Sequence, residues 1–184
     1  MAVRLNAPLS LEAVKSLHAG DSVLLSGVVY TARDAAHARM AEAIRKGEPL
    51  PVDLAGQTIY YAGPTPTPPG KAVGSIGPTT STRMDAYTPL MLSMGLRAMI
   101  GKGKRSQEVL KAMQEHPAVY FAAIGGAAAL MARCVTACQV VAYEDLGTES
   151  IKRLTLCDLP LIVAADCYGG DFYELGQKRY LESQ

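Results

Sequence analysis

Three short segments of the sequence carry cationic or hydroxyl side chains where a small anion could bind. They are 31–34 with Arg33, 77–83 with Thr79 and Arg83, and 101–106 with Lys102. The guanidinium fork of an arginine matches a carboxylate, and the glycines beside Lys102 would let a ligand approach the backbone closely. Together, Arg33, Arg83 and Lys102 would suit a dicarboxylate.

Each segment also has a plainer explanation. Asp34 could cap a helix beside a solvated Arg33, and one hydroxyl of the run 79–82 could cap the next helix. Capping accounts well for one hydroxyl of that run but poorly for the others. Segment 101–106 could be a solvated turn, because it lacks the phosphate-loop pattern G-x-x-x-x-G-K-[S/T].

No conventional general base or metal framework stands out. The three histidines are scattered along the chain: His18, His37 and His116. The cysteines form no C-x-x-C pair, although structural zinc usually uses two close pairs; they are Cys134, Cys138, Cys157 and Cys167. We interpret them as buried free thiols in a reducing cytosol, with a metal site as the less favoured alternative.

The elements that must position these segments alternate between strands and helices. Strands are predicted at 22–30, 58–62, 97–100, 118–124, 135–143 and 161–165. Helices are predicted at 11–17, 35–46, 83–94, 107–115, 127–133 and 172–181. Ser10 and Ser106 are expected as N-caps, Gly47 as a helix end, and Pro89 as a kink or an early position in its helix. The three anion-binding segments then lie where strands end or helices begin, and such ends converge on a ligand crevice in α/β sheets.

This order of elements predicts one α/β domain over 1–184, with helices covering a mixed, partly parallel sheet. Two consecutive strands are expected within 151–165, which favours a mixed sheet over a purely parallel one. The longest irregular segment, 63–83, is rich in proline. Because ordered elements flank it, we interpret it as functional rather than disordered.

Composition excludes several classes of protein. Eighteen Lys and Arg residues against 17 Asp and Glu residues leave a net charge of +1, so no strong field is available to hold a nucleic acid or a membrane surface. The apolar stretch 118–132 is short for a membrane span of about 20 residues and is interrupted by two glycines. The first ten residues lack the apolar core of a signal peptide, so we expect a cytoplasmic protein.

Five strings of the sequence resemble one known family. They are RDAAHAR (33–39), YYAGPTPTPPGKAVGSIGPTTSTRMD (60–85), GKGKRS (101–106), AVYFAAIGGAAALMA (118–132) and VVAYEDLGTESIKRL (140–154). In this order, over most of the chain, they resemble the β-subunit, or C-terminal domain, of iron–sulfur-dependent class I fumarase and L(+)-tartrate dehydratase. The resemblance implies a swivelling β/β/α-type domain.

The resemblance also implies a hydro-lyase that adds water reversibly to a C=C bond between two carboxylates. In that family a [4Fe–4S] cluster is held by cysteines of the partner α-subunit, so the four cysteines here are expected not to be ligands. Fumarate hydratase, a tricarboxylic acid cycle enzyme, is the favoured activity. L(+)-tartrate dehydratase and a mesaconate-type hydratase are the alternatives within the class.

Carried over by resemblance, Thr79 transfers a proton, and Arg33, Arg83 and Lys102 bind the substrate carboxylates. A threonine hydroxyl is a weak base, so a helix N-terminus and nearby cations would have to lower its pKa. A subunit that only binds a dicarboxylate, or a purely structural subunit, is the alternative from another class. The resemblance implies a hetero-oligomer with the α-subunit, and leaves contacts between two copies of this chain open.

Overall fold

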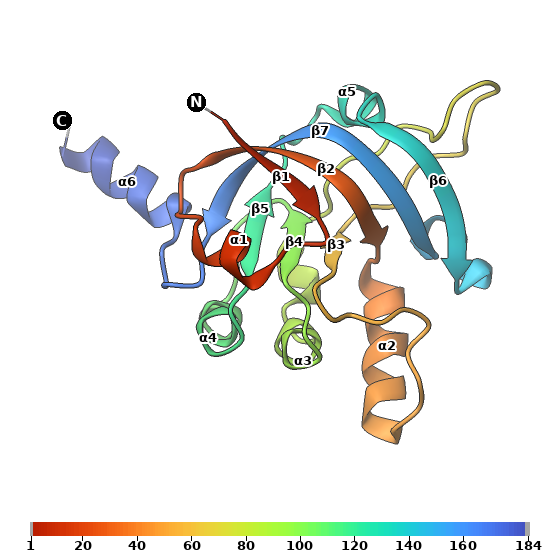
Figure 1. The fold of residues 1–184 in the computed structure, drawn as a ribbon, viewed down its shortest axis with the longest axis horizontal. Coiled ribbons are helices and arrows are strands. Elements are labelled where there is room, and N and C mark those ends of the chain that lie inside the picture. The colour runs from red at the N-terminus through yellow and green to blue at the C-terminus, as the bar shows by residue number, and fades with distance from the viewer. Residues whose placement is uncertain (1, 183–184) are drawn as a thin grey trace.

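Two long curved strands organise the structure, a computed structural model that describes residues 2–182. Strand β2 (Ser22–Thr31) and strand β7 (Ile151–Ala165) run antiparallel beside each other (Figure 1). On their outer edges, β1 (Val3–Ala7) pairs with β2 in parallel and β6 (Val135–Ala142) pairs with β7 in antiparallel orientation. These four strands form one curved layer.

Three short parallel strands form a second layer. They are β3 (Thr58–Tyr60), β4 (Ala98–Gly101) and β5 (Val119–Ala122). Strand β3 pairs with the end of β2, and β5 pairs with the last residues of β7. The pairings therefore close into a ring in the order β2–β3–β4–β5–β7 and back to β2, and the predicted mixed, partly parallel sheet is confirmed.

Helices form the third layer. Helix α2 (Asp34–Lys46), helix α3 (Thr88–Ser93) and helix α4 (Gln107–Glu115) cover the face of β3–β5 that points away from the curved strands (Figure 1). One apolar core lies between the two strand layers, and a second lies between β3–β5 and the helices. The layer order strand, strand, helix is the one expected for the β/β/α type.

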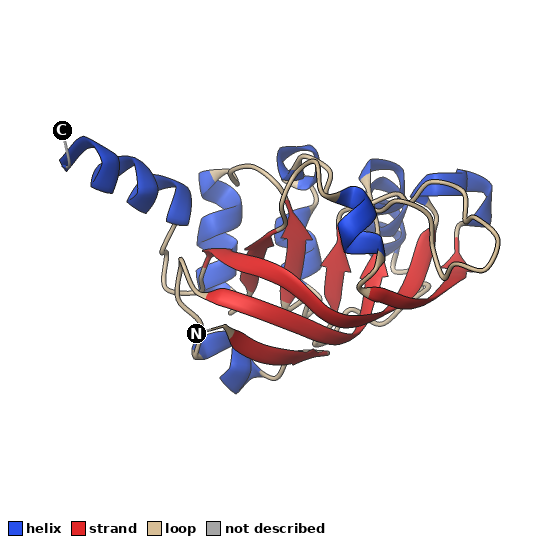
Figure 2. Ribbon diagram, turned by 90° about the horizontal axis from the view of Figure 1, so that it is seen from above, coloured by secondary structure: helices blue, strands red, loops and turns tan. Residues whose placement is uncertain are grey.

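Local signals placed several helix ends correctly. The Ser10 hydroxyl accepts a hydrogen bond from Ala13 N at the start of α1 (Leu11–Lys15), and Ser106 does the same for Val109 N at the start of α4. Gly47 ends α2 in the left-handed conformation at φ 71°. Helix α5 (Ala128–Ala132) directly precedes β6 in the chain, and helix α6 (Phe172–Glu182) projects away from the layers (Figure 2).

Two predicted elements are wrong in extent. The strands expected within 151–165 are one continuous strand, because β7 changes partners along its length, from β6 to β5, while β2 stays on its other edge. The helix expected at 83–94 is a single 3-10 turn, η1 (Ser81–Met84), followed by α3. Pro89 lies in the first turn of α3, where its missing N–H costs no hydrogen bond.

The short strand β1 was not predicted, since most of its side chains are exposed and give it no apolar pattern. Within residues 2–182, no helix has the length and apolarity needed to cross a membrane. The expectation of one domain over 1–184 also includes residues 1, 183 and 184, which lie outside the described residues.

Candidate functional site

The carboxyl ends of the parallel strands bring Arg33 and Arg83 to one carboxylate. Arg33 follows β2 in extended conformation at the start of α2, and Arg83 lies in η1. Asp34 Oδ2 is 3.8 Å from Arg33 Nη2 and 3.7 Å from Arg83 Nη1. Two guanidinium groups separated by 50 positions in the sequence therefore face the same oxygen atom.

Thr79 and Lys102 are brought together by their backbones. The Thr79 amide donates to the Tyr61 carbonyl at 2.7 Å, and the Lys102 amide donates to the Thr79 carbonyl at 3.3 Å. Thr80 and Lys102 form an isolated parallel bridge, which Ser81 N extends by donating to the Lys102 carbonyl at 2.9 Å. The segment that leads to Arg83 thus lies beside the ends of β3 and β4, as the predicted convergence requires.

The environment of Thr79 differs from the expected one. The regular helix begins only at Thr88, so no long helix starts beside the run of hydroxyls. Ser81 Oγ, one of those hydroxyls, is buried and hydrogen-bonds Tyr120 Oη at 2.8 Å. The Thr79 hydroxyl makes no hydrogen bond to any residue in 2–182 and is partly exposed. No helix N-terminus is therefore placed to make it acidic, and the cationic residue bonded to this segment is Lys102, through its backbone amide.

Two acidic residues of the site were missed. Asp34 is the first residue of α2 rather than its cap, and the cap position is held by Arg33 without a side-chain hydrogen bond. Glu149 lies 3.4 Å from Arg33 Nη2 through Oε1, and its Oε2 accepts from Ala35 N at 3.0 Å. Both residues lie inside strings of the family resemblance, which was the available signal.

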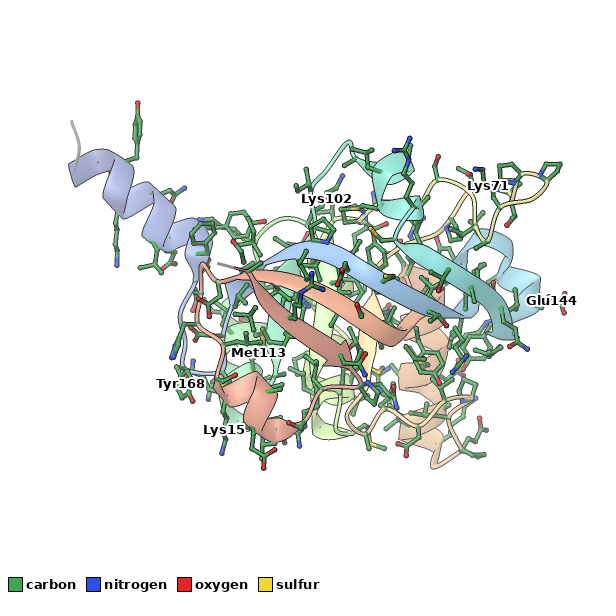
Figure 3. All side chains as sticks on the ribbon, turned by 45° about the horizontal axis from the view of Figure 1, so that its top comes forward. Lys15, Lys71, Lys102, Met113, Glu144 and Tyr168 are labelled. Atoms are coloured by element: carbon green, nitrogen blue, oxygen red, sulfur yellow. The ribbon has the colours of Figure 1, made fainter. Side chains whose placement is uncertain are left out.

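Two buried polar atoms of this site have no partner in the described chain, namely Arg33 Nε and Asp34 Oδ1. Burying a polar group without a hydrogen bond is costly, so these two atoms leave room for a hydrogen bond to water or to a ligand. The Arg33 side chain is 22% exposed and that of Arg83 is 57% exposed. The site is therefore partly buried at Arg33 and has an open rim at Arg83. Figure 3 shows Lys102 on the side of the molecule away from Lys15.

His37 hydrogen-bonds the backbone of Arg33. It is fully buried, its Nδ1–H donates to the Arg33 carbonyl at 2.9 Å, and its ring meets the edge of Tyr61. Burial lowers the pKa of His37 to about 4, against which the hydrogen bond to Arg33 acts only in part. His37 is therefore neutral at physiological pH and holds the backbone, not the substrate.

The cysteines of this chain do not fit an iron–sulfur cluster. Cys134 lies directly before β6, Cys138 on β6, Cys157 on β7, and Cys167 beyond the end of β7. All four are free thiols, but only Cys167 is buried; Cys134 and Cys138 are half-buried and Cys157 is exposed, so the expectation of buried thiols is wrong for these three. Across residues 2–182, no three Cys, His, Asp or Glu side chains gather at one point. Burial raises the pKa of the Cys134 and Cys138 thiols, which opposes the thiolate form that a cluster needs. A cluster on a partner chain stays a prediction.

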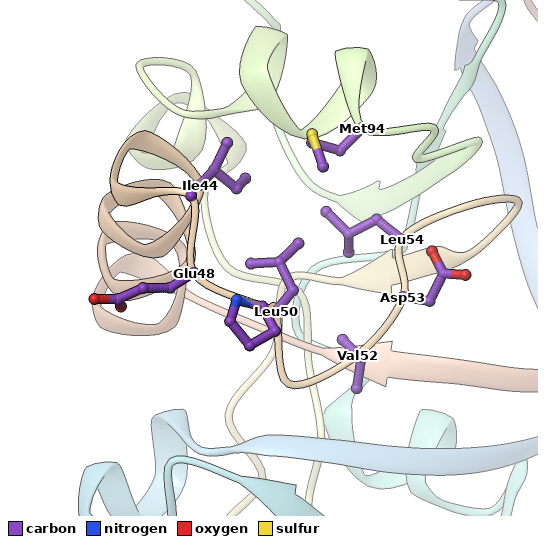
Figure 4. Close-up of a pocket in the computed structure, with 9 residues that line it drawn as sticks. Ile44, Glu48, Leu50, Val52, Asp53, Leu54 and Met94 are labelled. Carbon is purple, nitrogen blue, oxygen red and sulfur yellow. The ribbon is translucent and has the colours of Figure 1, made fainter.

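A separate hollow lies at the other end of α2. Its lining includes Ile44, Leu50, Leu54 and Met94 (Figure 4), and none of the four predicted site residues. Helix α2 has 13 residues, so this hollow is about 20 Å from Arg33 at the start of the helix. It plays no part in the site.

Comparison with known proteins decides the family. The model of the family described as "Fumarase C-terminus" matches residues 1–176. The chain belongs to the fumarase C-terminus family. The resemblance read from the sequence strings is thereby confirmed.

Relatives of this family differ in length. The chain is 39% identical to "Fumarate hydratase class I, aerobic" of Salmonella typhimurium over 94% of its own length and 30% of that protein. It is also 39% identical to "Fumarate hydratase class I, anaerobic" of Escherichia coli, over 94% of its length and 32% of that protein. It therefore spans about a third of these curated relatives. A further relative, from Methanocaldococcus jannaschii, is named "Putative L(+)-tartrate dehydratase subunit beta"; the identity is 39%, over 95% of this chain and 92% of that one.

Proposed function

We propose that this chain is the β-subunit of a two-subunit hydro-lyase that hydrates fumarate reversibly to L-malate in the cytoplasm. The observation that carries the proposal is the pair Arg33 and Arg83 on one carboxylate oxygen, with the buried Arg33 Nε unpaired. Membership of the fumarase C-terminus family supports it, and so does the near-equal length of the relative from Methanocaldococcus jannaschii.

In this proposal Arg33 and Arg83 bind one substrate carboxylate beside Asp34, and Lys102 binds the other. Asp34 keeps the two guanidinium groups together before substrate arrives, which offsets part of their mutual repulsion. Hydration adds a proton to one carbon of the double bond and a hydroxyl group to the other. Thr79 Oγ1 gives that proton and regains one from the water that supplies the hydroxyl group. In the reverse direction it takes the proton from carbon and returns it to the departing hydroxyl group, so one water is added or released in each turnover.

The cationic side chains have a second role in the same proposal. When the proton leaves the carbon next to a carboxylate, negative charge spreads onto that carboxylate. Preformed cations that face this group stabilise the charge where it develops, which is commonly the largest catalytic contribution. The same cations lower the pKa of a hydroxyl group beside them, so a threonine there can donate and accept the proton.

We place the [4Fe–4S] cluster on an α-subunit, because no set of cluster ligands gathers within residues 2–182. The open rim of the site supports a partner of this kind. Ile124 and Leu130 are 59% and 61% exposed on the turn and helix after β5, and a Cβ on Gly125 would lie 3.9 Å from Lys102 Cδ. A partner that covered these apolar groups would also close the site.

The second candidate is L(+)-tartrate dehydratase, which the name of the Methanocaldococcus jannaschii relative favours. A mesaconate-type hydratase would need the same carboxylate-binding side chains. These substrates differ from fumarate and malate by a hydroxyl or a methyl group, and both carboxylates are shared. Arg33, Arg83 and Lys102 therefore support a hydro-lyase acting on a dicarboxylate, but they do not select one of these substrates.

The test is co-expression with the α-subunit under anaerobic conditions, followed by assays with fumarate, mesaconate and L-tartrate. We expect turnover of fumarate by the assembled protein and none by this chain alone. Thr79→Ala should remove most of the turnover while dicarboxylate binding is kept, and Arg83→Ala should weaken binding. Near-normal turnover of Thr79→Ala would assign the proton transfer elsewhere, and unchanged affinity of Arg83→Ala would favour a structural subunit.

A further inference from the structure

A buried ion pair lies beneath the two segments that carry Arg83 and Lys102. Arg105 Nε donates to Asp85 Oδ1 at 2.8 Å, and the Arg105 side chain is fully buried. Asp85 directly follows η1, and Arg105 lies three positions after Lys102. The pair thus joins the two segments by charge, at a place where neither member is among the groups proposed to contact substrate.

The guanidinium of Arg105 is held on every side. Its Nη2 donates to Thr88 Oγ1 at 2.7 Å, and its Nη1 lies 3.4 Å from Tyr61 Oη. The rings of Tyr61 and Tyr120 flank it, with centroids at 5.3 and 5.0 Å from Cζ. Burial by itself would lower the pKa of Arg105, but Tyr61 and Asp85 raise it, so the group keeps its charge.

The carboxylate of Asp85 is equally well satisfied. Its Oδ2 accepts from Ser106 N at 2.8 Å, so both of its oxygens are bound to the segment that follows Lys102. A second link lies alongside: Tyr120 Oη donates to the Gly103 carbonyl at 2.8 Å and shares a hydrogen bond with Ser81 Oγ. A Cβ at Gly101 would collide with Ser81 Oγ, so this close approach depends on glycine there.

Stability alone does not explain an ion pair in this place. Removing two charges from water is costly, and well-packed apolar residues often replace such pairs without loss of stability. An arginine fork with a fixed carboxylate does, however, define one relative position of two segments in a way that apolar contacts do not. The segments joined here are those with Arg83 and Lys102.

We propose that Arg105 and Asp85 are positioning residues that set the separation of Arg83 and Lys102, so that one dicarboxylate can engage both. This inference rests on the proposed function. Arg105 acts through the two segments and does not touch the substrate. Its guanidinium fork, rather than its charge alone, is the property that matters.

The test uses Arg105→Lys in the assembled two-subunit protein, because lysine keeps the buried charge. The matched control is Arg97→Lys: Arg97 lies just before β4 and donates to the Pro117 carbonyl at 2.9 Å, at the opposite end of that strand. We expect the KM for the dicarboxylate to rise about tenfold in Arg105→Lys, with a smaller change in kcat, and neither value to move in Arg97→Lys.

A double-mutant cycle separates positioning from stability. In a Lys102→Ala background, Arg105→Lys should raise KM by less than about twofold, because the cation that it positions is gone. Additive effects would overturn the proposal. A lower melting temperature of Arg105→Lys with unchanged KM would do the same, since that pattern belongs to a pair that only stabilises the fold.

A measurement that needs no turnover keeps this inference apart from the proposed function. The amides of Ser81 and Lys102 form the hydrogen bonds that join the two segments, so their hydrogen exchange reports on the link. We expect exchange at both to be at least about tenfold faster in Arg105→Lys than in Arg97→Lys. Equal rates would overturn the positioning role. Faster exchange in a protein that hydrates no dicarboxylate would reject only the proposed function.

Discussion

Arg33 is held from two sides at the end of β2. Its carbonyl accepts from both the amide and the ring of His37 at 2.9 Å, and its guanidinium faces Asp34 and Glu149. The backbone contact is set by the four-residue spacing of one helical turn. Of the side-chain contacts, Asp34 is the next residue in the chain, whereas Glu149 comes from a distant segment, so the tertiary fold sets the direction in which the fork points.

The buried, neutral state of His37 makes stability depend on pH. Its pKa is about 4 in the folded protein and 6.5 when unfolded, so the unfolded chain binds more protons between these values. The stabilisation is complete above pH 6.5 and is lost as the pH falls towards 4, at about 1.4 kcal/mol per pH unit. The free energy of unfolding can be measured with urea at several pH values. Between pH 4 and 6.5 it should change less steeply with pH in His37→Gln than in the natural protein. Equal slopes would contradict the role of His37.

The absence of a side chain at Gly63 leaves room for the Arg33 side chain. A Cβ there would lie 3.0 Å from the Thr148 carbonyl and 3.3 Å from Arg33 Cδ, so Gly63→Ala must displace one of them. We expect a loss of about 1–3 kcal/mol in the free energy of unfolding and weaker dicarboxylate binding by the assembled protein. Gly176→Ala is the control, because nothing lies within 4 Å of its added Cβ. Identical behaviour of the two variants would count against the close packing at Arg33.

At the scale of elements, the turn η2 (Glu144–Glu149) brings its last residue to the start of α2. Lys152 on β7 holds this turn, since its Nζ donates to the carbonyls of Gly147 at 3.0 Å and Thr148 at 3.2 Å and to Ser150 Oγ at 2.6 Å. Burial lowers the pKa of Lys152, so these acceptors offset part of the cost of its charge. The pairing of β2 with β7, which sets Thr31 opposite Lys152, places Glu149 beside Arg33.

Removing the Lys152 amine should loosen this turn. Lys152→Met leaves several acceptors without a donor, and we expect the free energy of unfolding to fall by about 1–3 kcal/mol. Arg153→Met, at an exposed neighbouring position on β7, should change it by less than about 0.5 kcal/mol. Chemical denaturation of both variants measures the difference. Equal values for the two would show that η2 does not depend on Lys152.

At the scale of the whole molecule, the layers leave one face open. The site lies at the carboxyl ends of the parallel strands, where Lys102 and Arg83 are exposed, and no second domain within residues 2–182 covers them. Charges are nearly balanced over the whole chain, at +1, yet Arg33, Arg83 and Lys102 gather at this edge. A net charge therefore says little about the local field at this edge of the sheet.

If an α-subunit covers that face, Ile124 should lie in the contact. Ile124→Asp puts a charge at a position that the partner would bury, and we expect the Kd between the subunits to rise at least about tenfold. Leu11→Asp is the control, since Leu11 is 40% exposed on α1, which lies on the opposite side of the molecule (Figure 3). Analytical ultracentrifugation of the co-expressed pair would reveal the change. An effect of Leu11→Asp alone would place the partner on the other side.

Features that depend on neighbouring residues and on motifs could be predicted before the fold was known. Ser10, Ser106 and Gly47 end or begin helices through bonds within one turn, and the motif strings identified the family. Two other features could be seen only in the folded chain: 151–165 is one strand, and the Asp34 carboxylate lies between Arg33 and Arg83. Strand partners and contacts between charged side chains are non-local. They depend on how the ring of strands closes, and no local periodicity records that closure.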